Sequence, residues 1–307
     1  MLLFAWFLGC QTFVRISLAL LLFFLVLASG SHGGQEPKSL SKNSDTTEVL
    51  DVAQAMRMFY GNYDVTTQTS ITRLPKDTTS LPAPGEEQMT VRVLFHSFLG
   101  EPVARSLFLL TYAIPSNDKT YDCHACAPVI GMAVFSQNGQ KWHIDASNRA
   151  VTFAGEWGKP PKDIQLVTIG PNHVAAKIVD VGKETGGETT EVLELCVPWN
   201  GTVNLALQRI IADDDKGGCD PEGVPCYGNR RQLSFVGRDD TEYYDIELRL
   251  SGSDVPLDVS ASHQRKRQVS GLEVFRFDNG MYRQVSKDGD TTSLDEWMAK
   301  QKRKGPD

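Results

Sequence analysis

The sequence lacks an excess of basic residues. It has 31 Lys and Arg against 38 Asp and Glu, which gives a formal net charge of −7. Residues 1–30 carry one Arg and no acid, so the rest of the chain has a net charge of −8 (30 − 38). Binding to nucleic acid draws on clustered basic charge, and so does attraction to anionic lipid. We therefore expect no nucleic-acid partner, and no membrane contact except through the N-terminal residues if they are retained.

The sequence also lacks the short motifs of several large enzyme classes. It contains no Gly-x-Ser-x-Gly elbow, no His-Glu-x-x-His pair, no phosphate-binding Gly-rich loop and no dinucleotide fingerprint. Asp213–Gly218 begins like a calcium loop, but Gly217 at its fifth position and Val224 at its twelfth exclude an EF-hand. A solvated acidic turn is the alternative. We expect a protein that is not an enzyme and needs no cofactor.

One long hydrophobic stretch stands at the N-terminus. Ile16–Ala28 is an apolar run of 13 residues behind Arg15, followed by small residues, which is the pattern of a secretory signal. Leu2–Val14 is a second apolar run, which a simple signal peptide lacks. Residues 1–30 are therefore predicted to be either a signal peptide or an N-terminal anchor. In both cases the protein is exported. It is expected to be periplasmic or secreted if the leader is removed, and anchored in the inner membrane if the leader is kept.

Cysteine is scarce, with six residues in the chain, and Cys10 lies within the leader. In an oxidising compartment the others are expected to pair. Cys219 and Cys226 flank a short loop rich in Gly, Pro and acids, which favours a small-loop disulfide. Cys123, Cys126 and Cys196 then remain, so that one of them is free or forms an intermolecular bond.

The Cys123–Cys126 pair is the sharpest candidate for chemistry. His124 lies between the two thiols, and His143 lies across a predicted hairpin. Three interpretations stay open: a structural disulfide, a redox pair, and a metal site made of these four residues. The redox interpretation lacks the βαβ context in which a helix N-terminus lowers a thiol pKa. The metal interpretation lacks a visible second half of the ligand set.

Trp157 is the candidate ligand-contact residue. It lies in Gly155–Pro161, a segment rich in Gly and Pro. An exposed Trp at this position would anchor a ligand, whereas a Trp folded back would cap the sheet.

The rest of the chain predicts a mainly β domain over residues 46–290, preceded by a Ser- and Gly-rich linker over 31–45. A helix over 46–60, capped at Asp45, Thr46 or Thr47 and stopped by Gly61, opens the domain. Residues 251–270 are predicted to be an irregular loop, and 291–307 a short C-terminal helix with a tail. Between the helix over 46–60 and residue 290, the polarity of the residues alternates with period two, which indicates strands. The expected strands are 89–96, 105–112, 131–136, 141–146, 150–155, 164–170, 173–180, 191–199, 202–211, 232–237, 242–250, 272–277 and 281–285.

Turn residues join these strands into antiparallel hairpins. Asn138-Gly139, Asn200-Gly201 and Asn279-Gly280 are typical of tight two-residue turns with positive φ. Hairpins at this spacing without intervening helices predict a sandwich or a blade-like meander.

Several segments together resemble a group of uncharacterised exported bacterial proteins. The resemblance rests on the Cys-His-Ala-Cys-Ala-Pro segment at 123–128, on residues 147–149, 155–161 and 169–173, and on the ending Phe-Asp-Asn-Gly-Met-Tyr at 277–282. This group implies no activity. The sequence therefore favours an exported envelope protein acting as a non-catalytic binding or interaction module, with an envelope protein or a small ligand as its partner. The alternative is a periplasmic thiol–disulfide or metal-handling protein using Cys123 and Cys126.

Overall fold

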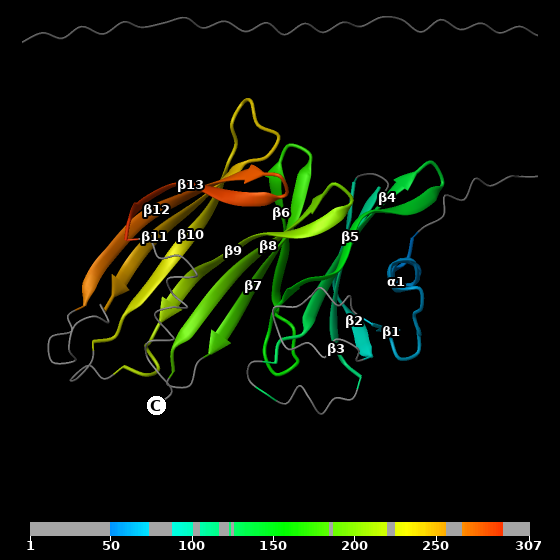
Figure 1. Cartoon of the computed structure of the whole chain (residues 1–307), viewed down its shortest axis with the longest axis horizontal. Helices are drawn as coiled ribbons and strands as arrows, with labels where there is room; N and C mark the ends of the chain where they lie inside the picture. The colour runs from blue at the N-terminus through cyan, green and yellow to red at the C-terminus, as the bar shows by residue number, and fades with distance from the viewer. Residues whose placement is uncertain are drawn as a thin grey trace, which may run out of the picture. The chain divides into compact units, whose positions relative to one another are not determined.

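The described part of the chain is mainly β. The structure is a computed structural model, and it describes residues 50–73, 88–100, 105–116, 123, 126–183, 187–219, 225–255 and 266–290 (Figure 1). These residues form one α-helix, α1 (Val52–Tyr60), and thirteen strands of a single mixed sheet. The strands are β1 (Ser70–Thr72), β2 (Met89–Leu99), β3 (Ser106–Pro115), β4 (Val129–Asn138), β5 (Lys141–Phe153), β6 (Asp163–Gly170), β7 (His173–Lys183), β8 (Thr189–Trp199), β9 (Thr202–Asp214), β10 (Gly228–Val236), β11 (Asp245–Asp254), β12 (Arg267–Asp278) and β13 (Met281–Gly289).

Some predicted segments lie outside the described residues. These are the leader over 1–30, the linker over 31–45 and the C-terminal helix over 291–307. The predicted irregular loop over 251–270 is shorter than expected. Strand β11 continues to Asp254 and β12 begins at Arg267, so both ends of that stretch belong to strands.

Helix α1 begins later than the sequence predicts. Its N-cap is Asp51, whose side chain accepts the backbone N–H of Gln54 at 2.6 Å, and the Gln54 side chain completes the capping box. The prediction missed this because Asp45, Thr46 and Thr47 offer the same chemistry a few residues earlier. The stop at Gly61 is confirmed, since Gly61 adopts a φ of 82° there.

Two of the predicted hairpin turns are confirmed in detail. Asn200 and Gly201 have φ values of 48° and 80°, and Asn279 and Gly280 have 49° and 82°. Two successive positive φ angles are what a type I′ turn requires, and they match the twist of the flanking strands.

The turn between β4 and β5 differs from the prediction by one residue. Asn138 pairs with Lys141, so Gly139 and Gln140 form the two-residue loop, and Gly139 with a φ of 63° is its residue of positive φ. A Gly at the first central position is typical of a type II′ turn.

The separate strand expected over 150–155 is not a strand of its own. Strand β5 runs without a break from Lys141 to Phe153 and includes most of it.

Strand β9 is the junction of the sheet. It pairs along its length with β8, which leads on to β7 and β6. Its other partners are β5, through a single parallel pair of Ser147 with Thr202, and β10, through three antiparallel pairs at the far end of β9. The parallel pair makes the sheet mixed, whereas the sequence predicts only antiparallel hairpins.

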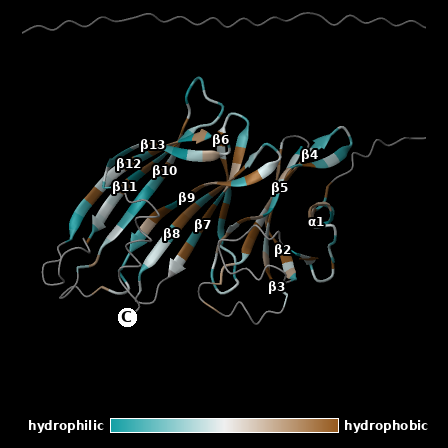
Figure 2. Ribbon diagram, viewed as in Figure 1, coloured by the Kyte–Doolittle hydropathy of each residue, from teal (hydrophilic) through white to brown (hydrophobic). Residues whose placement is uncertain are grey.

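Three buried apolar clusters hold these elements together. The first joins α1 to β2–β5, the second joins β6–β9 to β11–β13, and the third joins β3–β5 to β6–β9. Neighbouring residues of one strand enter different clusters: Leu107 and Leu109 belong to the first, and Phe108 and Leu110 to the third. Such strands are covered on both faces, so their residues from one end to the other favour hydrophobic types. Hydrophobic segments accordingly run along several strands in Figure 2.

Candidate functional site

The two cysteine pairs that the sequence singles out are both bridged. Cys219 and Cys226 form the disulfide that their spacing predicts, with Cα atoms 5.0 Å apart. Cys123 and Cys126 also form a disulfide, with Cα atoms 5.2 Å apart, and Cys126 donates its backbone N–H to the Cys123 carbonyl at 3.1 Å. Cys196 is the free cysteine of the described residues and is buried in β8.

These bridges bear on the compartment. Disulfides persist in oxidising environments and are rare where cytosolic reductants act, so two of them indicate an oxidising, non-cytoplasmic compartment. Among the residues that the structure describes, none of the helical segments has the length and apolar character needed to cross a bilayer.

Trp157 stands at the tip of a two-residue turn. Glu156 and Lys159 exchange backbone hydrogen bonds of 3.1 and 2.8 Å, while Trp157 and Gly158 between them have φ values of 53° and 65°. A Trp with positive φ is uncommon and is held there by its surroundings. Trp157 is 45% exposed as a residue, so it has not folded back completely onto the sheet.

The disulfide and this turn are fastened to each other. Gly158 donates its N–H to the Cys126 carbonyl at 2.8 Å, and Ala154 donates its N–H to the Pro128 carbonyl at 3.2 Å. The backbone from Cys126 to Pro128 therefore runs beside residues 154–158. The structure thus brings together two of the sequence-predicted candidates, Cys126 and Trp157.

His143 lies away from the cysteine pair. It pairs with Ser136 near the far end of the β4–β5 hairpin, where its Nε2 is 3.1 Å from Ser136 Oγ and 2.7 Å from Asp145 Oδ1. Ser136 is seven residues along β4 from Val129, or about 23 Å at the rise of a strand. His143 is therefore not available to a metal at Cys123 and Cys126. His124 lies outside the described residues, and no group of three or more metal-ligating side chains occurs within them.

The sequence did not identify a set of carboxyl groups near the Trp157 turn, namely Glu156, Asp180 and Glu194. The Asp180 Oδ2 accepts the Gly155 N–H at 2.8 Å, which ties the turn to β7. Burial raises the pKa of Asp180, and the nearby Glu156 carboxylate adds to the effect. A signal for this set exists in the sequence, because Glu194 interrupts the apolar stretch of β8, but it does not say which face of the strand the side chain enters.

Glu194 is the most buried member of this set. Glu194 is only 2% exposed. Its Oε1 accepts hydrogen bonds from the Thr152 hydroxyl at 2.9 Å and from the Gln208 amide at 2.8 Å. Burial raises the pKa of Glu194 to about 7, opposed by these two hydrogen bonds and assisted by Asp180. Cys196 is buried as well, and its burial raises the pKa of its thiol. The nearby Glu194 adds to this effect.

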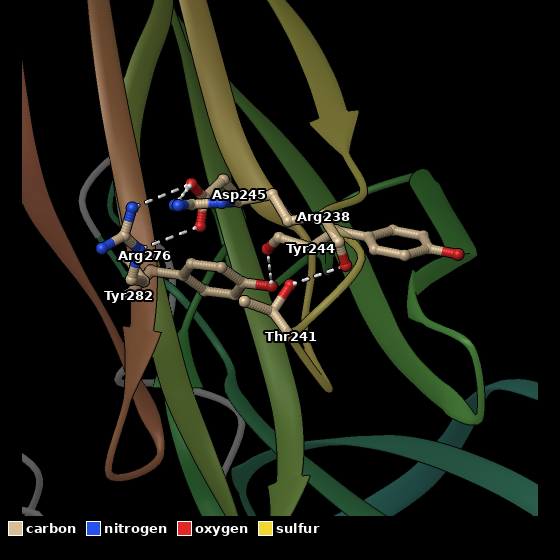
Figure 3. A network of polar contacts seen from close by, with 6 residues as sticks. All are labelled: Arg238, Thr241, Tyr244, Asp245, Arg276 and Tyr282. Carbon is tan, nitrogen blue, oxygen red and sulfur yellow. Dashed lines mark hydrogen bonds and ion pairs between the residues drawn. The ribbon is translucent and has the colours of Figure 1, made fainter.

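A second polar network fastens the connection between β10 and β11 (Figure 3). The Asp245 carboxylate receives Arg238 Nη1 at 3.1 Å and Arg276 Nε at 3.4 Å, and Tyr282 donates its hydroxyl to the Tyr244 carbonyl at 3.2 Å. Tyr244 in turn donates its N–H to the Ile169 carbonyl at 2.7 Å. The network ties β10–β13 to the end of β6, which is a structural role.

The acidic run over 213–218 begins at the end of β9 and is only in part the solvated turn that the sequence suggests, since residues 216–218 form an exposed turn. Asp213 and Asp215 are buried, and Asp215 Oδ1 accepts the Tyr227 N–H at 2.6 Å. This burial could not be predicted, because a run rich in charge and Gly is typical of an exposed turn, whereas β9 carries Asp213 and Asp214 into pairing with β10.

Comparison of the chain with protein-family models, with curated proteins and with solved structures finds no match. The structure itself defines a mainly β protein with two disulfides, and the disulfides indicate an oxidising compartment.

Proposed function

We propose that the protein is an exported envelope protein that works as a non-catalytic binding module, and that Trp157 is its contact residue. The observation that carries this proposal is the half-exposed indole at the tip of a turn whose backbone is held on two sides, by Cys126 and by Asp180. A large aromatic side chain in a fixed backbone loses little conformational entropy on binding, which is why Trp is enriched among binding hot spots. Its partner is an envelope protein or a small ligand.

The position of the perturbed groups supports a role without catalysis. Glu194 has its pKa raised to about 7, in the range useful to a general base, but it lies in the buried cluster between β5 and β8. A general base has to come within hydrogen-bond reach of the substrate. Glu194 is instead committed to Thr152 and Gln208.

Export is part of the same proposal. The two disulfides support an oxidising compartment, and the apolar leader over residues 1–30 is the means of reaching it. The resemblance to uncharacterised exported bacterial proteins points the same way. A sandwich is the arrangement we propose for the sheet, because buried clusters lie on both faces of β7–β9.

The test replaces the indole and follows a partner. A photo-crosslinking side chain is placed in vivo at position 159, which is exposed and lies two residues after Trp157. The crosslinked species of this protein are then compared with those of the same protein carrying Trp157→Ala. Met281→Ala is the matched control, since Met281 is 43% exposed and lies in β13, which belongs to another part of the sheet. We expect a discrete crosslinked species that Trp157→Ala abolishes and Met281→Ala retains. An unchanged species in Trp157→Ala contradicts the proposal.

One observation favours a second function, thiol–disulfide exchange or metal handling at Cys123 and Cys126. Cys123 is exposed, so an incoming thiol could reach and reduce the bridge, and the two thiolates formed by that reduction could then bind a metal. Against this, α1 is the one helix of the described residues and lies far along the chain, so no helix N-terminus is shown to lower a thiol pKa. Thiol trapping and metal analysis decide between the two functions. A pair that cycles between oxidised and reduced forms, or that holds stoichiometric zinc, would replace the binding module with the second function.

A further inference from the structure

Two parts of the sheet are joined through very few backbone hydrogen bonds. Strands β1–β5 and strands β6–β13 meet in one parallel pair, Ser147 with Thr202. What holds β5 against β7–β9 beyond that pair is the third apolar cluster and the side chains that cross it. The joint is therefore sensitive to any charge placed within that cluster.

Glu194 lies within this joint. Its Oε1 bonds to Thr152 of β5 on one side and to Gln208 of β9 on the other, so one carboxyl oxygen bridges the two parts. The second oxygen, Oε2, is buried and has no hydrogen-bond partner among the described residues. An ionised carboxylate with one unsatisfied oxygen in an apolar cluster is costly.

The groups that face Glu194 do not offset a negative charge. Strand β7 contributes Asp180, and β8 itself contributes Cys196. Glu156 of the 154–158 turn lies near Asp180 and adds a further negative charge on that side. Strands β5 and β9 contribute the uncharged Thr152 and Gln208. In the described part of the chain, no basic side chain acts on Glu194 or Asp180 strongly enough to be among the causes of their shifted titration.

We propose that Glu194 is a proton-operated latch between β5 and β8, closed when the carboxyl is neutral and loosened when it ionises. In the neutral form the carboxyl fits the apolar cluster and keeps β5 on β7–β9. Ionisation places a negative charge beside Asp180 without a cation, which weakens the packing of the Thr152 end of β5 and of the turn that follows it. The latch does not depend on Trp157 binding a partner.

The direction of the pH effect follows from the pKa of Glu194. It is about 7 in the folded protein against 4.5 for an ordinary Glu, so the folded state holds the proton more tightly than the unfolded state. The contribution of Glu194 to the stability of the folded state is therefore full below pH 4.5 and is lost as the pH rises to 7. The difference of about 2.5 (7 − 4.5) corresponds to a loss on the order of 100-fold in the folding equilibrium constant.

The experiment uses the full-length chain, purified in mild detergent because of its apolar leader. The melting temperature is measured from pH 4.5 to 8.5 for the wild type and for Glu194→Gln, which keeps an acceptor for Thr152 and cannot ionise. Glu191→Gln is the matched control, because Glu191 lies on the same strand but pairs with the exposed Arg230. We expect the Glu194→Gln protein to gain stability relative to the wild type as the pH rises, whereas the control stays parallel to the wild type. A constant difference between Glu194→Gln and wild type at all pH values overturns the latch.

Hydrogen exchange of the wild type keeps the test decisive if Glu194→Gln fails to fold. Amide exchange, corrected for its intrinsic pH dependence, is compared at pH 5 and pH 8. The latch predicts faster opening at pH 8 for the β5 segment around Thr152 and for residues 154–158, with β11 and β12 unchanged as an internal reference. Equal protection of β5 at both pH values refutes it.

Discussion

Arg231 of β10 and Glu273 of β12 form an ion pair inside the sheet, with Arg231 Nε 3.6 Å from Glu273 Oε2 and side chains only 5% and 0% exposed. Two charges removed from water this completely are stable only as long as they compensate each other. Burial lowers the pKa of Arg231, while Glu273 and, to a smaller extent, Asp213 act in the opposite direction. The pair joins two strands that have no hydrogen bonds to each other, since β11 lies between them.

Removing one partner of this pair should therefore be severe. Glu273→Ala removes the larger of the two carboxylate charges that act on the buried Arg231 guanidinium. We expect it to lower the free energy of unfolding by about 3 kcal/mol, the lower end of the range for broken buried pairs. Glu191→Ala breaks an exposed pair with Arg230 and should cost less than about 1 kcal/mol. Urea denaturation of both variants compares the two costs. Equal, small losses would show that the buried pair carries no special weight.

Gly131 of β4 is predicted to tolerate no side chain. A Cβ built there would lie 2.7 Å from the Tyr60 hydroxyl and 2.8 Å from Thr111 Oγ1, which are hydrogen-bonded to each other at 2.7 Å. Gly131→Ala should therefore destabilise the protein by about 1–3 kcal/mol through overpacking and the displaced hydrogen bond. Thermal melting provides the measurement.

Two further variants test the physical reason for the Gly131 effect. Gly182→Ala is the control, because a Cβ on this strand glycine meets nothing closer than the Thr190 carbonyl at 3.9 Å, and it should be close to neutral. Adding Tyr60→Phe to Gly131→Ala removes the nearest atom and should recover part of the lost stability. If the double variant loses as much stability as the two single variants lose together, or more, steric contact with Tyr60 is not the cause.

The Cys123–Cys126 bridge is expected to stabilise the turn that carries Trp157. Its closed loop is short, with a sequence separation of 3, so the chain-entropy contribution is about 2 kcal/mol. Replacing both cysteines by Ser should lower the free energy of unfolding by about that amount and increase proteolysis near residues 154–158. The double Ser variant of Cys219 and Cys226 is the comparison, since it should lose a similar stability without exposing this turn. A Cys123/Cys126 variant that is as stable and as resistant to protease as the wild type would contradict a structural role.

The hydrogen bond from Thr152 sets the pH range over which Glu194 titrates. This bond stabilises the ionised carboxylate and so lowers the pKa of Glu194 from the value that burial alone would impose. Thr152→Val removes the donor and should raise the pKa of Glu194 further above 7. Because the folded state then holds its proton to higher pH, the loss of stability with rising pH should extend to a higher pH than in the wild type. Melting curves between pH 6 and pH 9 measure the shift, with Thr90→Val as a control, since the Thr90 hydroxyl contacts Ser116 at the surface. A shift to lower pH in Thr152→Val would reverse the assignment.

Local patterns of the sequence predicted most of the elements. Gly61 ends α1, and the Asn-Gly pairs at 200–201 and 279–280 form tight turns, because positive φ is a property of those residues in their immediate neighbourhood. The disulfide of Cys219 and Cys226 was predicted from their spacing, the composition of the loop between them and the expected oxidising compartment. Predictions failed where several residues offered the same local chemistry, as with the helix cap, which is Asp51 and not one of the three candidates before it.

The candidate site was only partly accessible to the same reasoning. The sequence singled out Cys123, Cys126 and Trp157, since their types are rare, and the structure placed Cys126 beside the Trp157 turn. It could not exclude His143 as a fourth ligand, because sequence distance across a hairpin says little about distance along the strands. Nor could it identify Glu194, whose chemistry depends entirely on which face of β8 is covered.

By itself the amino-acid sequence determined that the chain is rich in antiparallel hairpins, that tight turns close at residues 200–201 and 279–280, and that Cys219 pairs with Cys226. These features depend on residues within a few positions of one another. The tertiary structure alone decided that β5 meets β9 in a parallel pair, that Thr152 and Gln208 converge on Glu194, and that Arg231 faces Glu273. Such contacts join residues from about 14 to 55 positions apart, and their chemistry comes from burial, which no local pattern encodes.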